Sequence, residues 1–358
     1  MLFLSVGRAL ADSDLGDGCA PSLAVDHAGH VLLVYECRSQ VCFRRSEDGP
    51  GAWGAELPVS DPGRISTRPA LAVEPGGAID VVWEDCISGS HHAYLARSTD
   101  GGHSWSPARS LSDNACEPTV AAGPGGIHVV WSDARDIFYS SSADGSLTWS
   151  KPCKLSRGAG EAAAPAVAVG QDSVVHVAWV ESSPGLERPH LLYLKGHQQS
   201  WSQPAIAGTV PDAARKPNLA VDSYGAAHLA WSSTSPLHRF SQVYTSNAVG
   251  DHFAMATYFA SPSNSSQPGG AMSPDNHWVV AWSASSNDPG IFLAQSSNLG
   301  VGFTDPCNVS HAGVSPQAPA VAIARDQIVL VWDEVAGGQH RLKTATLPKA
   351  HPHSYPRK

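Results

Sequence analysis

The stretch that decides the fold runs from Pro69 to Trp83 and reads PALAVEPGGAIDVVW. Six further copies of this phrase occur, at Pro21–Tyr35, Pro118–Trp131, Pro165–Trp179, Pro217–Trp231, Gly270–Trp282 and Pro319–Trp332. The aromatic residues that end successive copies are separated by 48, 48, 48, 52, 51 and 50 positions. Self-similarity at one such period predicts a repeat architecture in which each copy forms one structural unit.

Each copy has the pattern of short β-strands. Proline opens an apolar strand, where its missing N–H is tolerated, and a second apolar strand ends at the aromatic residue. In the second copy a third strand is expected at His92–Ser98 and a fourth at Trp105–Asp113. Four strands per repeat are typical of a β-propeller blade, whose two faces are covered by the neighbouring blades.

We therefore expect an all-β chain that forms a single seven-bladed β-propeller with four-stranded antiparallel blades. The blades are predicted at approximately 18–62, 66–114, 116–158, 163–210, 215–262, 267–312 and 317–347. The seventh copy lacks a fourth strand, and Leu4–Asp12 aligns with Trp105–Asp113 position for position. Residues 2–12 are thus expected to complete the last blade and close the ring, and 349–358 to form a flexible tail.

Composition excludes several other classes. Among 358 residues, 33 are Gly and 27 are Pro, and only 15% are charged, against the usual quarter. This composition favours tight turns and argues against a helical bundle, a coiled coil or a disordered chain. A net charge of -9 argues against a nucleic-acid partner, which needs a basic face. No apolar run approaches the roughly 20 residues of a membrane helix.

The turn between the third and fourth strands carries a second motif. Ser98–Trp105 (STDGGHSW) matches Ser-x-Asp-x-Gly-x-x-Trp, and Ser46–Trp53 and Ser142–Trp149 match it except at the fifth position. The repeat resembles the Asp-box (BNR) propellers of the sialidase-like superfamily over almost the whole chain. An Asp in a tight turn caps backbone N–H groups, so a structural role is expected. This role is predicted for Asp48, Asp100 and Asp144.

Charged residues gather at the loops before the first strand and after the second strand of each blade. We call the face that these loops form the mouth. Ligands of propellers usually bind there, at the axis, so the mouth is the predicted site. The candidate catalytic residues are Glu36, Glu84, Asp85 and Asp133, and the candidate ligand-binding residues are Arg38, Arg68, Glu117, Arg135, Asp136, Glu181, Arg215, Lys216, Asp333 and Glu334.

The resemblance implies a sialidase-like glycoside hydrolase as one possible activity. Sialidases bind the substrate carboxylate with three arginines, and Thr67-Arg68-Pro69 is close to their Arg-Ile-Pro motif but lacks the Ile. The second and third arginines have only weak candidates, Arg135 and Arg215, and sialidases typically have six blades. Other glycosidases need only two carboxyl groups at a set separation, which the mouth could supply. A lyase would need a His or Tyr base near an Arg, and His91, His92 and Tyr94 are in that region.

Seven cysteines and seventeen histidines give few further signals. Two disulfides are possible, Cys37–Cys42 and Cys86–Cys116, with Cys19 competing for Cys37. His128, His176 and His228 recur three residues before the blade Trp, as expected of strand residues that pack or hydrogen-bond between blades. No metal-ligand spacing is present, although clustered carboxylates at the mouth could hold Ca²⁺.

The favoured function is a non-catalytic recognition propeller that binds a glycan or a protein at the mouth without a cofactor. The alternative is an exo-acting, sialidase-like glycoside hydrolase that uses a carboxylate pair at the same place. Disulfides would suit a secreted or periplasmic protein whose export signal is absent from this chain, with a cytoplasmic location left open. The oligomeric state is not predicted.

Overall fold

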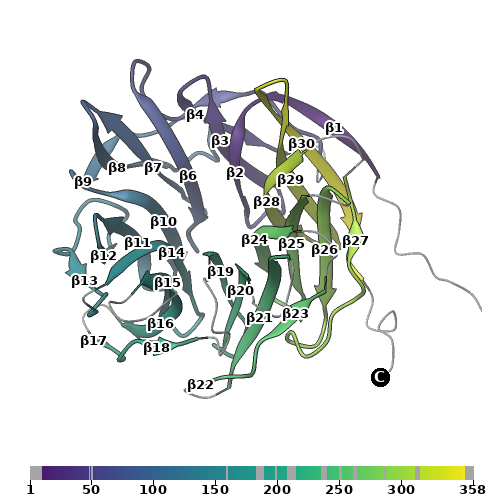
Figure 1. Ribbon diagram of the computed structural model, residues 1–358. Helices are drawn as coiled ribbons and strands as arrows, with labels where there is room; N and C mark the ends of the chain where they lie inside the picture. The colour runs from purple at the N-terminus through teal and green to yellow at the C-terminus, as the bar shows by residue number, and fades with distance from the viewer. Residues whose placement is uncertain are drawn as a thin grey trace, which may run out of the picture.

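The computed structural model shows an all-β ring of seven blades around a central axis (Figure 1). It describes residues 10–47, 49, 51–158, 160–182, 189–197, 200–207, 215–234, 240–249, 252–260, 264–285, 288–310 and 315–350. Each blade is an antiparallel sheet whose strands follow one another outward from the axis. The seven-bladed propeller predicted from the repeat is confirmed. No helix among these residues is long and apolar enough to span a membrane.

The strands of the first four blades follow the repeat in chain order. Blade 1 contains β2 (Cys19–Val25), β3 (Val31–Cys37), β4 (Gln40–Arg45) and β5 (Leu57–Pro58). Blade 2 contains β6 (Ile65–Val73), β7 (Ile79–Ile87), β8 (Ser90–Ser98) and β9 (Arg109–Ser112). Blade 3 contains β10 (Cys116–Gly123), β11 (Gly126–Asp133), β12 (Asp136–Ser142) and β13 (Cys153–Lys154). Blade 4 contains β14 (Glu161–Val169), β15 (Val175–Ser182), β16 (His190–His197), β17 (Ser200–Trp201) and β18 (Ala205–Ile206).

The last three blades complete the ring. Blade 5 contains β19 (Arg215–Val221), β20 (Ala227–Ser233), β21 (Gln242–Val249), β22 (His252–Phe253) and β23 (Thr257–Phe259). Blade 6 contains β24 (Asn264–Met272), β25 (Trp278–Ser285), β26 (Gly290–Ser296) and β27 (Cys307–Asn308). Blade 7 contains β28 (Ser315–Ala324), β29 (Gln327–Ala336), β30 (Gln339–Pro348) and, as its outer strand, β1 (Leu10–Asp17).

Ring closure by an N-terminal strand is confirmed. The closing strand, β1 at Leu10–Asp17, overlaps the predicted residues 2–12 at its first three residues and continues to Asp17. β1 pairs antiparallel with β30, and Asp14 lies opposite Lys343. Asp14 Oδ2 is 2.8 Å from an Arg341 guanidinium nitrogen and 3.3 Å from Lys343 Nζ. These ion pairs give the physical reason for the register, because they align the acidic part of the N-terminal segment with two cations of β30. Residues 1–9 lie outside the described part of the chain.

The C-terminal segment also departs from its prediction at its first two residues. The backbone N–H of Lys349 donates to Asp326 O at 2.9 Å, and its side chain pairs with Asp275 of blade 6. The backbone N–H of Ala350 donates to Gln295 Oε1 at 2.7 Å. These contacts hold Lys349 and Ala350 on the ring, so a flexible tail cannot begin before 351.

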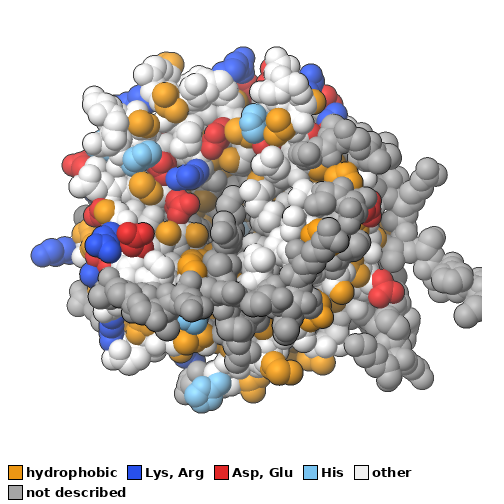
Figure 2. Space-filling view, in the orientation of Figure 1, with side chains coloured by type: hydrophobic (Ala, Val, Ile, Leu, Met, Phe, Trp, Pro, Cys, Tyr) orange, Lys and Arg blue, Asp and Glu red, His pale blue; other side chains and the backbone are white. Residues whose placement is uncertain are grey.

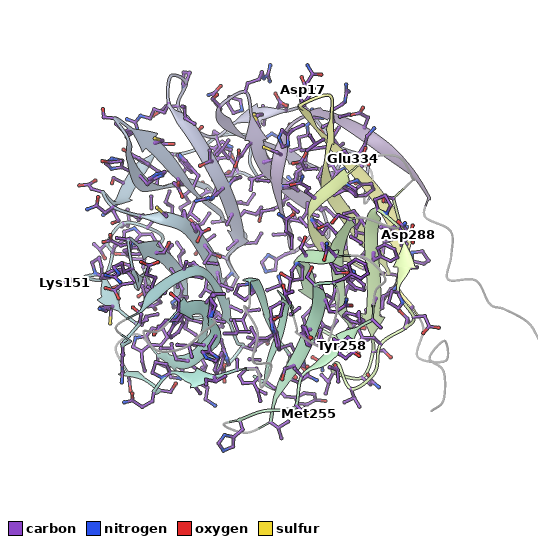
Figure 3. The ribbon with its side chains drawn as sticks, viewed as in Figure 1. Asp17, Lys151, Met255, Tyr258, Asp288 and Glu334 are labelled. Atoms are coloured by element: carbon purple, nitrogen blue, oxygen red, sulfur yellow. A yellow bond between two sulfur atoms is a disulfide. The ribbon has the colours of Figure 1, made fainter. Side chains whose placement is uncertain are left out.

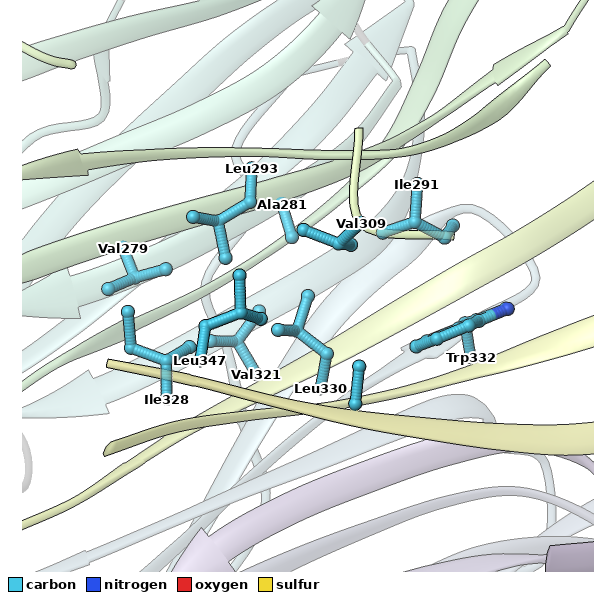
Figure 4. Packing of buried hydrophobic residues seen from close by; sticks show 11 residues of the cluster. Val279, Ala281, Ile291, Leu293, Val309, Val321, Ile328, Leu330, Trp332 and Leu347 are labelled. Carbon is cyan, nitrogen blue, oxygen red and sulfur yellow. The ribbon is translucent and has the colours of Figure 1, made fainter. Parts of the chain in front are cut away.

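Apolar side chains from adjacent blades form the core. Between blades 6 and 7, Val279 and Leu293 of one sheet pack against Ile328, Leu330 and Leu347 of the next (Figure 4). The Trp or Tyr that ends each repeat phrase is buried in the same way. At about 25 cal/mol per Å² of buried apolar surface, these contacts between sheets supply the main stabilisation of the ring.

A left-handed residue precedes the proline of the inner strand in six blades. These residues are Ala20, Arg68, Glu117, Ala164, Gln267 and Ala318, with φ between 46° and 53°. At each of them the register with the second strand shifts, as in a β-bulge. Bulges redirect side chains and backbone N–H groups, and here they do so at the mouth of every such blade.

Two of the recurrent histidines give the fold a predictable pH dependence. His128 and His176 are buried and bonded to Tyr139 and Tyr193, and burial lowers the pKa of each to about 4. The unfolded chain takes up these protons near pH 6.5, so stability is lost as the pH falls from about 6.5 to about 4. We expect each histidine to lower the free energy of unfolding by about 3 kcal/mol as the pH falls across this range.

This expectation is tested by urea unfolding of the wild type and His176→Gln at pH 7.5 and pH 4.5. Because all other groups titrate alike in both proteins, the variant should lose less stability on acidification. Equal losses in the two proteins would contradict the assignment.

Candidate functional site

The predicted site residues lie where the inner strands begin and the second strands end. On the face shown in Figure 2, basic, acidic and histidine side chains lie close together over blades 2 and 3. Two groups at the mouth combine an acid, a histidine and a cysteine from equivalent repeat positions. One lies between blades 2 and 3 and the other between blades 7 and 1.

The first group, the Arg68 cluster, consists of Arg68, Glu84, His91 and Cys116. Glu84 is buried, and its Oε1 accepts a hydrogen bond from His91 Nδ1 at 2.6 Å. Its Oε2 accepts hydrogen bonds from Arg68 at 3.2 Å and from the backbone N–H of Glu117 at 2.8 Å. The Arg68 side chain is 53% exposed and that of His91 48%. A buried carboxylate therefore holds a cation and an imidazole at the surface, side by side.

The second group, the Cys19 cluster, consists of Cys19, Glu36, Asp333 and His340. Asp333 Oδ2 is 2.7 Å from His340 Nδ1, and the Cys19 thiol donates to Glu36 Oε2 at 3.3 Å. Burial, together with Glu36, raises the pKa of the Cys19 thiol to about 12. Burial also raises the pKa of Asp333, and the charges of Glu36 and Glu334 add to this effect.

Three of the candidate glutamates bond to the backbone of the next blade. Glu36 Oε1 accepts from Arg68 N at 2.7 Å, and Glu84 accepts from Glu117 N. Glu117 Oε2 in turn accepts from Ala164 N at 2.8 Å. Each donor is a left-handed bulge residue, and Gln267 makes the same contact with Ala318 N at 2.6 Å. We call these contacts the inter-blade bonds, since each ties one blade to the following one.

Three other candidate acids bond to the tryptophan two residues earlier. Indole N–H groups donate to Asp85 from Trp83 at 2.8 Å, to Glu181 from Trp179 at 3.0 Å and to Glu334 from Trp332 at 2.9 Å. Asp85 also accepts from Ser66 at 2.6 Å and pairs with Arg64 at 3.3 Å. These contacts explain the recurrence of an acid after the blade Trp by side-chain hydrogen bonding within each blade.

The remaining candidates are dispersed among local partners. Arg38 pairs with Glu56, and Arg135 lies 3.8 Å from Glu161. Asp136 pairs with Lys154 at 2.8 Å, and burial together with Asp136 raises the pKa of Asp133. Among the described side chains, Arg68 and Arg135 thus have different acidic partners. The side chains of Arg215 and Lys216 lie outside the description.

Asp100 and Asp144 bond within their own turns. Asp100 accepts from the backbone N–H of Ser104 at 2.9 Å and from the hydroxyl of Ser98 at 2.8 Å. Asp144 makes the corresponding contacts with Thr148 and Ser142. These contacts are those of turn-stabilising residues. Asp48 lies outside the described residues.

One of the two expected disulfides is present. Cys37 and Cys42 are bonded across the β3–β4 turn, whereas Cys86 and Cys116 are free thiols. The Cys86–Cys116 pairing is therefore wrong for this structure. The physical reason is that Cys116 Sγ lies within 4.8 Å of ligand atoms of Glu84 and His91, inside the Arg68 cluster.

A cavity of about 920 Å³ lies at the opposite end of the axis. It is lined by the far ends of the inner strands β2, β19, β24 and β28, largely by Ala, Val and Gly, with Asp26, Asp275 and Arg325 at its turns. Its lining offers few groups for chemistry. The mouth carries the denser set of exposed donors, and we take it as the candidate site.

The acid–histidine–cysteine pattern shared by the two clusters was not predicted from the sequence. His91 and His340 each stand eight residues after the blade Trp, and Cys116 and Cys19 each stand two residues before a Pro. This repeat spacing was available as a signal. The three residues come from two blades, so only the closed ring shows that they meet.

Comparisons with solved structures give the fold. A PL25 ulvan lyase bound to -[GlcA(1-4)Rha3S]- superposes with a TM-score of 0.70 at 12% identity, covering 96% of both chains. An α-L-arabinofuranosidase from Fusarium graminearum gives 0.61 at 11% identity, covering 96% of this chain and 98% of that one. A protein of unknown function from Dyadobacter fermentans gives 0.62 at 15% identity, covering 97% and 100%. No family model and no curated protein matches the sequence.

Proposed function

We propose that the propeller recognises a glycan with a carboxylate-bearing sugar at its mouth, and that Arg68 binds the carboxylate. The observation that carries this proposal is the Arg68 cluster, in which a buried Glu84 holds an exposed guanidinium beside an exposed imidazole. A guanidinium has five N–H donors, and Glu84 takes one direction only. The outward nitrogens are thus available for a bidentate contact with a sugar carboxylate.

The partition of charge at the mouth supports an acidic ligand. Most candidate carboxylates are directed into the protein, toward backbone N–H groups or indoles. Arg68 and His91 instead remain about half exposed. An incoming anion would therefore meet the Arg68 guanidinium before it meets these carboxylates. The solved ulvan lyase of the same fold is bound to a saccharide that contains GlcA, which is consistent with this ligand class.

The carboxylate pair of a glycosidase is less well supported. Glu36, Glu84 and Asp85 already accept internal hydrogen bonds, and two of them form inter-blade bonds. A general acid or nucleophile must be free to reach the glycosidic bond. We therefore place recognition ahead of hydrolysis.

A second candidate function is β-elimination on a uronic acid, favoured by the Glu84–His91 contact. Glu84 accepts from His91 Nδ1, so in the neutral form of the imidazole Nε2 is the acceptor nitrogen. In this reaction Nε2 takes the C5 proton, the C4–O4 bond breaks and a C4=C5 double bond forms. The departing O4 takes a proton from water. Arg68 would neutralise the carboxylate that stabilises the carbanion.

The two functions separate in one set of measurements on glucuronate oligosaccharides. Arg68→Asn keeps a residue that tolerates positive φ, and we expect it to weaken binding by about 10- to 100-fold. His91→Gln should bind nearly as well as the wild type but lose any formation of unsaturated product. Binding is read by calorimetry and elimination by ultraviolet absorbance.

Arg109→Asn is the matched control, because Arg109 bonds backbone oxygens of Ser146 and Leu147 in a turn of blade 3 away from the mouth. Neutral arabino-oligosaccharides serve as the control ligand. Equal affinity of wild type and Arg68→Asn for glucuronate would refute carboxylate recognition by Arg68. Product formation by His91→Gln at the wild-type rate would refute the elimination mechanism.

A location outside the cytoplasm is consistent with an acidic glycan as the ligand. The Cys37–Cys42 disulfide is typical of proteins in oxidising compartments. We accordingly propose that the protein works outside the cytoplasm, where acidic polysaccharides are accessible.

A further inference from the structure

We propose that Cys19, Asp333 and His340 form a binding site for Zn²⁺ between blades 7 and 1. One ligand atom from each of these residues lies within 4.8 Å of the other two. Cysteine sulfur, imidazole nitrogen and a carboxylate oxygen are the three donor types that zinc takes in proteins. The mixed donor set distinguishes this site from a calcium site, which needs oxygen ligands alone.

An unpartnered oxygen points to an ion as the missing partner. Asp333 is 4% exposed, and its Oδ1 has no hydrogen-bond partner among the described residues. Its other oxygen is used by His340. A buried carboxylate oxygen without a donor is costly, and a cation beside it would remove that cost.

The equivalent position between blades 2 and 3 shows why the oxygen is left over. There the acid is Glu84, whose longer side chain reaches the bulge N–H of Glu117 and also meets Arg68. Asp333 is one carbon shorter, and among the described residues its carboxylate is hydrogen-bonded to His340 alone. With Asp in place of Glu at this repeat position, one carboxylate oxygen is left without a hydrogen bond. That oxygen is available to coordinate a metal ion.

The surrounding charge also favours a cation. Glu36 accepts from the Cys19 thiol, and Glu334, labelled in Figure 3, lies next to Asp333 in β29. Asp17, labelled in the same figure, lies opposite Arg341 in the strand register, and Arg341 lies opposite Glu334, so Asp17 marks the same end of blade 7. The Arg68 cluster differs because Arg68 lies 3.2 Å from Glu84 and would repel a metal ion. Zinc binding would release the Cys19 proton, which is donated to Glu36 Oε2 in the metal-free protein, and would take the unprotonated ring nitrogen of His340.

The Arg68 cluster serves as the negative control, because it has an acid, a histidine and a cysteine at the same repeat positions as the Cys19 cluster. The test is titration of the purified full chain with Co²⁺, whose thiolate complexes absorb in the near ultraviolet. We expect one Co²⁺ per chain, displaced by Zn²⁺. Cys19→Ser should lose the thiolate band and weaken binding by about 100-fold or more, and Cys116→Ser should change neither.

A second measurement needs no variant. Zinc should protect Cys19 from alkylation, as read by peptide mass, while leaving Cys116 reactive.

Circular dichroism melting of Cys19→Ser checks that the variant is folded. Absence of a thiolate band in the wild type, its persistence in Cys19→Ser, or its loss in Cys116→Ser would overturn the proposal. Equal alkylation of Cys19 with and without zinc would also overturn it.

Discussion

Removal of residues 1–17 is expected to lower the melting temperature by on the order of 10 °C. The deletion removes β1, which supplies the fourth strand of blade 7 and joins the two ends of the ring. It also removes the Asp14 ion pairs and the packing of Leu15 against the cluster that contains Tyr35 and Leu342. With β30 left as an open edge, the shortened protein should also associate with itself more readily.

The measurement is thermal unfolding by circular dichroism, with size-exclusion chromatography for self-association. A synthetic peptide of residues 10–17, added in excess, should restore part of the lost stability because it can occupy the vacant edge of β30. Asp14→Asn tests the ion pairs alone and should cost much less than the deletion. An unchanged melting temperature after deletion would show that β1 does not hold the ring closed.

Glu84→Ala is expected to cost about 3 kcal/mol of folding free energy and to abolish binding of acidic glycans. The substitution removes a buried acceptor shared by Arg68, His91 and the Glu117 N–H. The inter-blade bond between blades 2 and 3 is lost, and Arg68 is left without the partner that positions it. Both effects have one cause, so they should appear together.

Glu117→Ala isolates the structural part of this effect. Glu117 makes the corresponding inter-blade bond to Ala164 N, and its variant should lose stability while keeping most glycan binding. Glu161→Ala, at a side chain that is 68% exposed, should change neither quantity. Urea unfolding and calorimetry give the two readouts. A Glu84→Ala protein as stable as Glu161→Ala would refute the assigned role of the inter-blade bond.

The propeller architecture could be predicted because every repeat carries the same local sequence pattern. The proline, the apolar strands and the terminal Trp recur at one period, and burial of that Trp needs only an adjacent sheet. The need for an N-terminal closing strand follows from the missing fourth strand of the seventh copy. Its register does not, because it depends on contacts of Asp14 with Arg341 and Lys343, more than 300 residues away in the sequence.

The sequence predicted that the candidate site lies at the mouth. It did not predict the hydrogen bonds that the residues of the mouth make. A left-handed residue before proline is disfavoured in general, so nothing in the sequence pointed to the bulges at Arg68 and Glu117. Without the bulges the inter-blade bonds cannot be foreseen, and Glu36 and Glu84 resemble free catalytic acids. The Glu84–His91 contact joins adjacent strands, but its meaning depends on Arg68 and Cys116, which other strands supply.

The pairing of β1 with β30 has a consequence for how the protein can be attached to anything else. Leu10 lies opposite Thr346, near the end of β30 that is far from the mouth, and Lys349 contacts Asp275 in a turn that lines the cavity at that far end. Both ends of the described chain thus leave the ring on its underside. A tether at either terminus, to a surface, a bead or a fused domain, would leave Arg68 and His91 facing outward and open to a long polymer.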